Sequence, residues 1–124
     1  MNDRKIILVA EENRKINRLV SYFLLKAGFD VINAYDGRAA LKAVEEKAVD
    51  ATIIETMLPF LDGLQVLWQI RQSNPYLPVL MTSLKIREAD RQQSLELGAN
   101  DFITKPFELK QLIESLNKIM GEQQ

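Results

Sequence analysis

Short apolar runs alternate with amphipathic segments five times along this chain of 124 residues. The runs cover residues 5–9, 31–32, 51–54, 78–82 and 102–104, and we predict that each of them forms a β-strand. Apolar residues recur at helical spacing within residues 16–27, 37–44, 64–74 and 107–120, and we predict a further helix at residues 86–97, where only Ala89, Leu95 and Leu97 could form a core stripe. Five strand–helix units in succession predict an α/β domain, in which helices cover both faces of a doubly wound, five-stranded parallel sheet.

Length and composition limit what such a domain can do. We expect a single domain over residues 1–124, with its core at about residues 4–120 and with residues 121–124 as a tail or the start of a linker. The chain has no Cys and no His, which excludes disulfides, thiol nucleophiles, histidine bases and zinc sites built on those ligands. A net charge of −1 gives no field that would attract nucleic acid or an anionic membrane. The longest apolar stretch is far shorter than the ~18 residues of a membrane span, and no signal-peptide pattern is present, so we expect a cytoplasmic protein.

Acidic residues end two of the predicted strands. Glu11 and Glu12 follow the first apolar run, and Glu55 follows the third. If the strand order is 2-1-3-4-5, these two strands are neighbours, and Ser83 and Lys105 lie at the carboxyl ends of the fourth and fifth strands. Three carboxylates, a hydroxyl and an ammonium in one crevice suit a hard divalent cation, or a phosphoryl group held by metal and lysine. Taken singly, the residues have simpler explanations, since acids complement a helix dipole, serine caps helices and lysine is usually solvated.

Several motifs carry a resemblance to a known family. They are Ile6-Ile7-Leu8-Val9 before an acidic pair, Met57-Leu58-Pro59 with Asp62-Gly63, Pro78-Val79-Leu80-Met81 before Ser83, and Gly98-Ala99-Asn100-Asp101-Phe102-Ile103-Thr104-Lys105-Pro106-Phe107. In this order and at these spacings, they make the chain resemble a response-regulator receiver domain of bacterial two-component signalling over about residues 4–120. The resemblance implies a flavodoxin-like (βα)5 fold with strand order 2-1-3-4-5 and a role in phosphorelay signal transduction.

The resemblance assigns metal and acceptor positions residue by residue. Glu11 and Glu12 match the acidic pair that holds Mg²⁺ in the family, and the backbone carbonyl of Met57 would complete the metal shell. Glu55 matches the position that accepts a phosphoryl group from the histidine of a partner kinase and that also faces the metal.

The resemblance also assigns the residues that sense the phosphoryl group. The hydroxyl of Ser83 and the ammonium of Lys105 would contact its oxygens. Phe102 matches an aromatic switch residue, which swings inward when Ser83 is drawn toward the phosphate. The peptide bond between Lys105 and Pro106 is expected to be cis.

Three features depart from the family pattern. The family has Asp where this chain has Glu55, its acidic pair is rich in Asp where both members are Glu here, and Leu84 stands where a small residue is usual. One methylene moves a carboxylate by more than ~1 Å, whereas positioning tolerances for such chemistry are ~0.5 Å. Leu84 would also crowd the path of a phosphodonor or a hydrolytic water. We therefore expect a pseudo-receiver, which is not an enzyme and acts as a protein-interaction switch without phosphorylation.

Alternatives remain open for this site. Glu55 either reaches Lys105 and Ser83 in place of a phosphoryl group, or belongs to a decayed site in a domain that works by binding alone. A phosphorylation-competent receiver that uses Mg²⁺ is the alternative function. Because Mg²⁺ requires near-ideal octahedral geometry, three longer glutamate side chains could overfill its shell. Weak binding of Mg²⁺ or Ca²⁺ and a direct ion pair between a glutamate and Lys105 are therefore both candidates.

Other classes of function lack the residues that they need. A flavodoxin-like cofactor-binding domain would need a phosphate-binding loop after the first strand, where Glu11-Glu12-Asn13 repels phosphate. An NTPase would need a Gly-rich loop with lysine, and this chain has none. Ser83 with Lys105 is the only candidate pair for hydrolysis, and the acids beside it suit metal binding or ion pairing better.

The resemblance further implies protein partners. These are a sensor histidine kinase, an output domain or output protein, and a second copy that binds the face formed by the fourth helix, fifth strand and fifth helix. Residues 86–97 are mostly charged or polar, which is typical of a solvated face and also fits a charged dimer surface. We identify no nucleic-acid or membrane-binding feature, so DNA binding would need a domain outside this chain.

Overall fold

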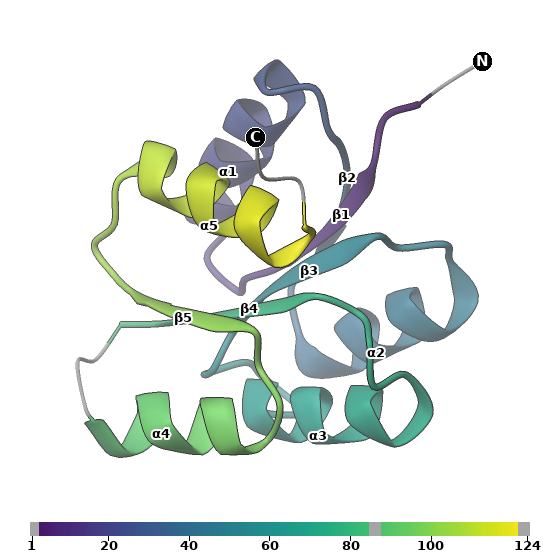
Figure 1. Cartoon of the computed structure of the whole chain (residues 1–124), viewed down its shortest axis with the longest axis vertical. Coiled ribbons are helices and arrows are strands. Elements are labelled where there is room, and N and C mark those ends of the chain that lie inside the picture. Colours follow the sequence, from purple (N-terminus) through teal and green to yellow (C-terminus); the bar gives the residue numbers. More distant parts are fainter. Residues whose placement is uncertain (1–2, 85–87, 122–124) are drawn as a thin grey trace.

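The sheet expected from the sequence is present in the computed structural model, which describes residues 3–84 and 88–121. Its five parallel strands lie in the order β2-β1-β3-β4-β5. The strands are β1 (Ile6–Ala10), β2 (Asp30–Ala34), β3 (Ala51–Glu55), β4 (Val79–Ser83) and β5 (Asp101–Thr104). A helix follows each strand, so the chain returns over a face of the sheet before the next strand begins (Figure 1). The predicted doubly wound α/β fold and its strand order are confirmed.

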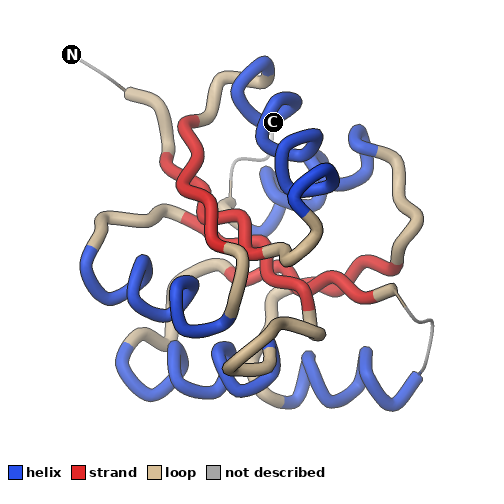
Figure 2. The backbone as a smooth tube through the Cα atoms, turned by 180° about the vertical axis from the view of Figure 1, so that it is seen from behind, coloured by secondary structure: helices blue, strands red, loops and turns tan. Residues whose placement is uncertain are grey.

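The described helices cover both faces of the sheet. Helices α1 (Arg14–Lys26) and α5 (Leu109–Ile119) lie together on one face (Figure 1). Helices α2 (Gly37–Glu46), α3 (Gly63–Ser73) and α4 (Glu88–Glu96) lie on the other, as the view from behind also shows (Figure 2). No helix within residues 3–84 and 88–121 is long and apolar enough to cross a membrane.

Alternate residues of the strands supply two apolar layers. On β1, Leu8 and Ala10 join the layer beneath α2 and α3, whereas Ile7 and Val9 join the layer beneath α1 and α5. Strands β3 and β4 are buried along their whole length. A strand that is covered on both faces needs apolar residues at successive positions, which explains why these strands read as continuous apolar runs.

Polar side chains fix the starts of three helices. Asn13, Asp36 and Asp62 precede α1, α2 and α3, and a side-chain oxygen of each accepts a backbone N–H of the first turn, at 3.1, 2.8 and 2.7 Å respectively. These bonds satisfy amides that have no partner within the helix. At the end of α4, Gly98 has a φ of +106°, which agrees with the helix stop predicted there.

The strand ends differ from the predicted ends by one or two residues. Strand β2 covers Asp30–Ala34 and not only residues 31–32, because polar Asp30 and Asn33 also pair with β1. Strands β3 and β4 likewise extend to Glu55 and Ser83, which pair with the neighbouring strands. Apolar patterning shows which side chains are buried but not where backbone pairing stops. The helix predicted at residues 86–97 covers Glu88–Glu96, and residues 86–87 lie outside the described part.

Arg71 of α3 ties together the edge of the sheet at which β5 begins. Its guanidinium donates to the carbonyl oxygens of Gly98 at 2.9 Å and Asn74 at 3.0 Å, and to Oδ1 of Asn100 at 2.9 Å. Burial lowers the pKa of Arg71 below its ordinary value. Because Gly98 and Asn100 precede β5, this network lies at the opposite edge from the predicted site and has a structural role.

Candidate functional site

Three of the predicted site residues meet at the carboxyl edge of the sheet. Glu11 follows β1, Glu55 is the last residue of β3, and Lys105 follows β5. The two acids are brought close because β1 and β3 are hydrogen-bonded neighbours. The crevice between them has a volume of about 700 Å³, and Glu12 and Met57 also line it.

Lys105 pairs with both buried acids. Its ammonium contacts Oε1 of Glu11 and Oε1 of Glu55. The exposed fractions are 8% for Glu11, 2% for Glu55 and 8% for Lys105, so salt and water screen these contacts much less than they would at the surface. We call these three side chains the ion triad. Two carboxylates and one ammonium leave it with one unit of negative charge.

The second oxygen of each carboxylate is bound by nearby donors. Glu11 Oε2 accepts the backbone N–H of Asn13 at 2.9 Å. Glu55 Oε2 accepts from the Thr56 hydroxyl and from the backbone N–H of Met57, both at 3.3 Å. Glu55 Oε1 touches the ammonium but receives no hydrogen bond of acceptable geometry from the described residues. This contact is an ion pair without a hydrogen bond, since attraction between opposite charges depends on their distance more than on bond angle.

Glu12 does not join the ion triad. Its side chain is exposed, although it lines the same crevice as the sequence predicted. Within residues 3–84 and 88–121, no three acidic side chains are grouped so that they could hold a metal ion. The direct ion pair between a glutamate and Lys105 that the sequence suggested is present, and it involves both Glu11 and Glu55.

The two predicted switch residues, Ser83 and Phe102, lie on β4 and β5. Ser83 ends β4 and is 1% exposed, and its carbonyl oxygen accepts the backbone N–H of Lys105 at 2.7 Å. Phe102 of β5 is 3% exposed and belongs to the apolar layer beneath α2 and α3. The guanidinium of Arg91 from α4 lies 5.1 Å from the centroid of its ring. The aromatic side chain is therefore turned inward.

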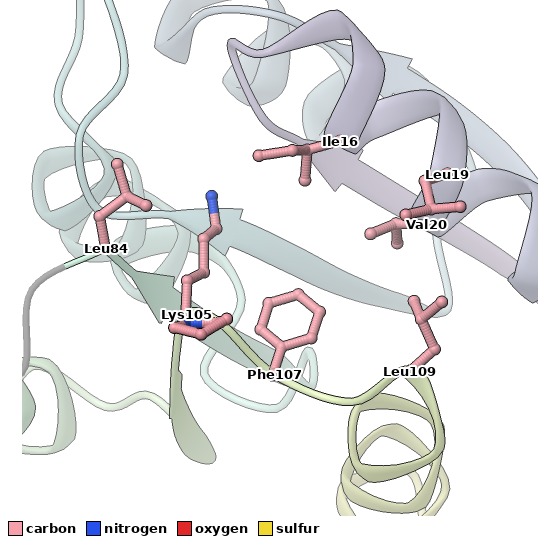
Figure 3. Close-up of a pocket in the computed structure, with 8 residues that line it drawn as sticks. Ile16, Leu19, Val20, Leu84, Lys105, Phe107 and Leu109 are labelled. Atoms are coloured by element: carbon pink, nitrogen blue, oxygen red, sulfur yellow. The ribbon is translucent and has the colours of Figure 1, made fainter.

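An apolar pocket of about 490 Å³ adjoins the crevice and shares Ile16, Leu84 and Lys105 with it. The side chain of Lys105 rises between Leu84 and Ile16 (Figure 3). The other lining residues come from α1 and from the segment that leads into α5, and they are Leu19, Val20, Pro106, Phe107 and Leu109. The Lys105–Pro106 peptide bond at the base of this pocket is cis, as predicted. Leu84 is 61% exposed, so it borders both cavities without filling either.

Asn17, which the sequence did not single out, holds the chain segment that carries Glu11. Its Nδ2 donates to the carbonyl oxygens of Val9 at 3.2 Å, Glu11 at 3.1 Å and Ala34 at 3.1 Å. Its Oδ1 accepts from Asn33 Nδ2 at 2.5 Å, and the side chain is fully buried. The sequence could have indicated this role, because Asn17 is a polar residue on the buried, apolar face of a predicted helix.

Gly63 sets the distance between α3 and the end of β3. A Cβ atom added at this position would lie 2.1 Å from the backbone carbonyl oxygen of Glu55. Only glycine allows this approach, so the residue after Asp62 positions the strand end that carries the acceptor-position acid. The sequence motif Asp62-Gly63 marked the loop but did not indicate this contact.

Comparisons with known proteins agree with this architecture. The model of the response regulator receiver domain family matches residues 7–117. The alkaline phosphatase synthesis transcriptional regulatory protein PhoP of Bacillus subtilis is 40% identical over 116 residues, which are 94% of this chain and 48% of that protein. The chain spans about half the length of the curated relatives it matches.

Solved structures show the same fold. The receiver domain of the Francisella response regulator 1452 superposes with a TM-score of 0.90 at 30% identity, over 95% of this chain and 98% of that one. The receiver domain of the sensor histidine kinase PA1611 from Pseudomonas aeruginosa superposes with a TM-score of 0.87 at 28% identity, over 95% of this chain and 98% of that one, and it has a magnesium ion in its active site cleft. With its flavodoxin-like fold and a family match over nearly its whole length, the chain belongs to the response regulator receiver domain family.

Proposed function

We propose that this receiver domain acts as a protein-interaction switch that works without phosphorylation. The observation that carries the proposal is the contact between Glu55, at the acceptor position, and the Lys105 ammonium inside a buried site. In the family, that ammonium holds a phosphoryl oxygen. Here a carboxylate of this chain already occupies it, and Phe102 is turned inward as the family's active state requires.

The strength of this built-in contact sets how far it biases the switch. A charge-assisted contact contributes ~1.5–3 kcal/mol, whereas moving an equilibrium from 1:99 to 99:1 requires ~5.5 kcal/mol. Glu55 also has one charge and two oxygens, fewer than a phosphoryl group. The proposal therefore includes two states that are closely balanced in this chain, with Glu55 favouring the inward position of Phe102.

Access to the site supports the same function. Leu84 is largely exposed beside the crevice, where a phosphodonor would have to approach. The carboxylate of Glu55 is 2% exposed, and its oxygens are engaged by Lys105, Thr56 and Met57. An attacking carboxylate would have to leave these partners first, which adds to the barrier for phosphoryl transfer.

The receiver domain of PA1611 holds magnesium in its active site cleft, so the fit of this crevice to a metal matters. The residues present here do not fit one. Lys105 occupies an oxygen of both Glu11 and Glu55, and no group of three acids is found in the part of the chain that the structure describes. The proposed function therefore has no metal-dependent step.

The proposed partners are a sensor histidine kinase, an output domain or an output protein. The similarity to a transcriptional regulatory protein about twice as long favours an output domain. A second copy is proposed to bind the face formed by α4, β5 and α5. Since α4 is mostly polar and charged, the association constant of such a dimer should fall as salt increases.

The proposal is tested by intact mass after incubation with a small acyl phosphate and Mg²⁺. We expect no phosphoryl adduct on the wild-type chain, little on Glu55→Asp, and more on Glu55→Asp combined with Leu84→Ala. A stoichiometric adduct on the wild type that disappears in Glu55→Gln would show instead a phosphorylation-competent receiver. Circular dichroism verifies that each variant is folded, so that a missing adduct cannot be attributed to unfolding.

A further inference from the structure

The position of the Lys105 ammonium has a second consequence. Its charge lies between two buried carboxylates that come from different strands, Glu11 after β1 and Glu55 at the end of β3. A cation at that place holds the two strand ends together against the repulsion of their acids. In an oxygen-lined crevice this is the task that a divalent metal ion performs.

We infer that the Lys105 ammonium takes the place of a divalent cation in this crevice, so that the acidic site stays assembled without metal. The inference uses the proposed function only to identify the crevice as the receiver site. It does not depend on whether Glu55 is phosphorylated.

The oxygens of the crevice show why a metal would compete poorly. Mg²⁺ needs about six oxygen ligands in near-octahedral geometry. One oxygen of each buried acid is held by the ammonium, and the other by backbone or hydroxyl donors from Asn13, Thr56 and Met57. A metal would have to displace the ammonium and break at least some of these hydrogen bonds. Of the three acids that line the crevice, Glu12 alone is not paired with the ammonium, and its side chain is exposed to water.

The surroundings of Lys105 make its displacement unfavourable. On one side lies the apolar pocket, which is lined by Ile16 and Leu84 on either side of the lysine and by Phe107 farther from the ammonium (Figure 3). An ammonium moved toward that pocket would lose its counter-ions and face apolar side chains, which is costly. The stem of the lysine lines this apolar pocket while its ammonium reaches the two carboxylates, so the observed position suits both parts of the side chain.

The inference is tested with Mn²⁺ as the probe, because bound Mn²⁺ loses the six-line electron paramagnetic resonance spectrum of the free ion. Three proteins are titrated: the wild type, Lys105→Met, and the control Lys110→Met, which removes an exposed lysine of α5. We expect no saturable binding below millimolar Mn²⁺ for the wild type and the control. The Lys105→Met variant leaves two carboxylates without a counter-ion, and it should bind Mn²⁺ at least ~10-fold more tightly than the wild type does.

A measurement on the wild type alone covers the case in which Lys105→Met does not fold. In nuclear magnetic resonance spectra of the lysine ammonium groups, the buried Lys105 signal should stay unchanged as Mg²⁺ is added. Saturable binding by the wild type that is as tight as in Lys105→Met, or a Mg²⁺-dependent loss of the Lys105 signal, would overturn the inference. Such binding without a phosphoryl adduct would leave the proposed function standing, whereas an adduct on Glu55 would overturn that function separately.

Discussion

The ion triad predicts that its members contribute unequally to stability. Replacing Lys105 by Met keeps the length of the apolar stem but removes the only charge that compensates Glu11 and Glu55 within the triad. Both acids are at least nine-tenths buried. Removal of one partner from a buried pair costs ~3–5 kcal/mol, and here one substitution leaves two carboxylates uncompensated. We therefore expect Lys105→Met to lower the free energy of unfolding by at least ~3 kcal/mol.

Glu55→Gln should be much milder. Lys105 keeps its ion pair with Glu11, and the amide oxygen of Gln can still accept from Thr56 and Met57. The triad then has no net charge instead of one negative charge. We expect a change of no more than ~1 kcal/mol in either direction, since one contact is lost while repulsion between the two acids disappears.

Urea unfolding followed by circular dichroism measures both changes, in the presence of a chelator so that trace cations do not bind the variants. The slope of the free energy against urea should stay the same, because the surface exposed on unfolding does not change. Lys110→Met serves as the control and should lie within ~0.5 kcal/mol of the wild type. Equal losses for Lys105→Met and Glu55→Gln, or a loss below ~1 kcal/mol for Lys105→Met, would refute the unequal roles.

Three further substitutions are measured by urea unfolding, two at supports of the site and one at an exposed residue with positive φ. Asn17→Leu should cost ~2–4 kcal/mol because three buried carbonyl oxygens lose their shared donor, and a loss below ~1 kcal/mol would contradict its positioning role. Gly63→Ala should cost at least ~3 kcal/mol, since its Cβ would lie 2.1 Å from the backbone of Glu55. The control Gly121→Ala should cost only ~1 kcal/mol, because its Cβ would meet nothing within 4 Å and only the φ of +77° is unfavourable. Phe60→Asn should raise the free energy of unfolding by up to ~1 kcal/mol, because Phe60 is 74% exposed and has a φ of +69°, a conformation that Asn tolerates better. A clear loss of stability would show that contacts of the exposed ring outweigh the backbone strain.

The fold could be predicted from the sequence because every local signal is compatible with the same structure. Apolar runs such as residues 51–54 can form strands or short buried helices, but alternation with five amphipathic segments leaves the parallel sheet as the consistent solution. The same logic placed Glu11, Glu55 and Lys105 at one edge, because the carboxyl ends of parallel strands share that edge. Their ion pairing was one of two alternatives, and only the structure distinguishes it from an open acidic site.

Other features could not be predicted, because they depend on the direction in which a side chain points and not on its position in the sequence. Glu11 and Glu12 are adjacent in sequence, yet one side chain points into the sheet edge and the other remains exposed. That difference follows from the turn between β1 and α1, where Asn17 and Asn13 bind the backbone and carboxylate of Glu11. The close approach of Gly63 to β3 is likewise a tertiary contact with no local sequence signal beyond the glycine itself.

The distance along the chain between the members of the ion triad also affects the order of folding. Glu11 and Lys105 are 94 positions apart, so both acids are synthesised long before the ammonium that compensates them. A nascent chain that assembled β1 and β3 first would bring two carboxylates together without a counter-charge, and their mutual repulsion is unfavourable. Partial sheets that lack β5 are therefore penalised, and the domain is expected to fold as one cooperative unit. The residue that follows the last of the five strands supplies the counter-ion on which burial of the first acids depends.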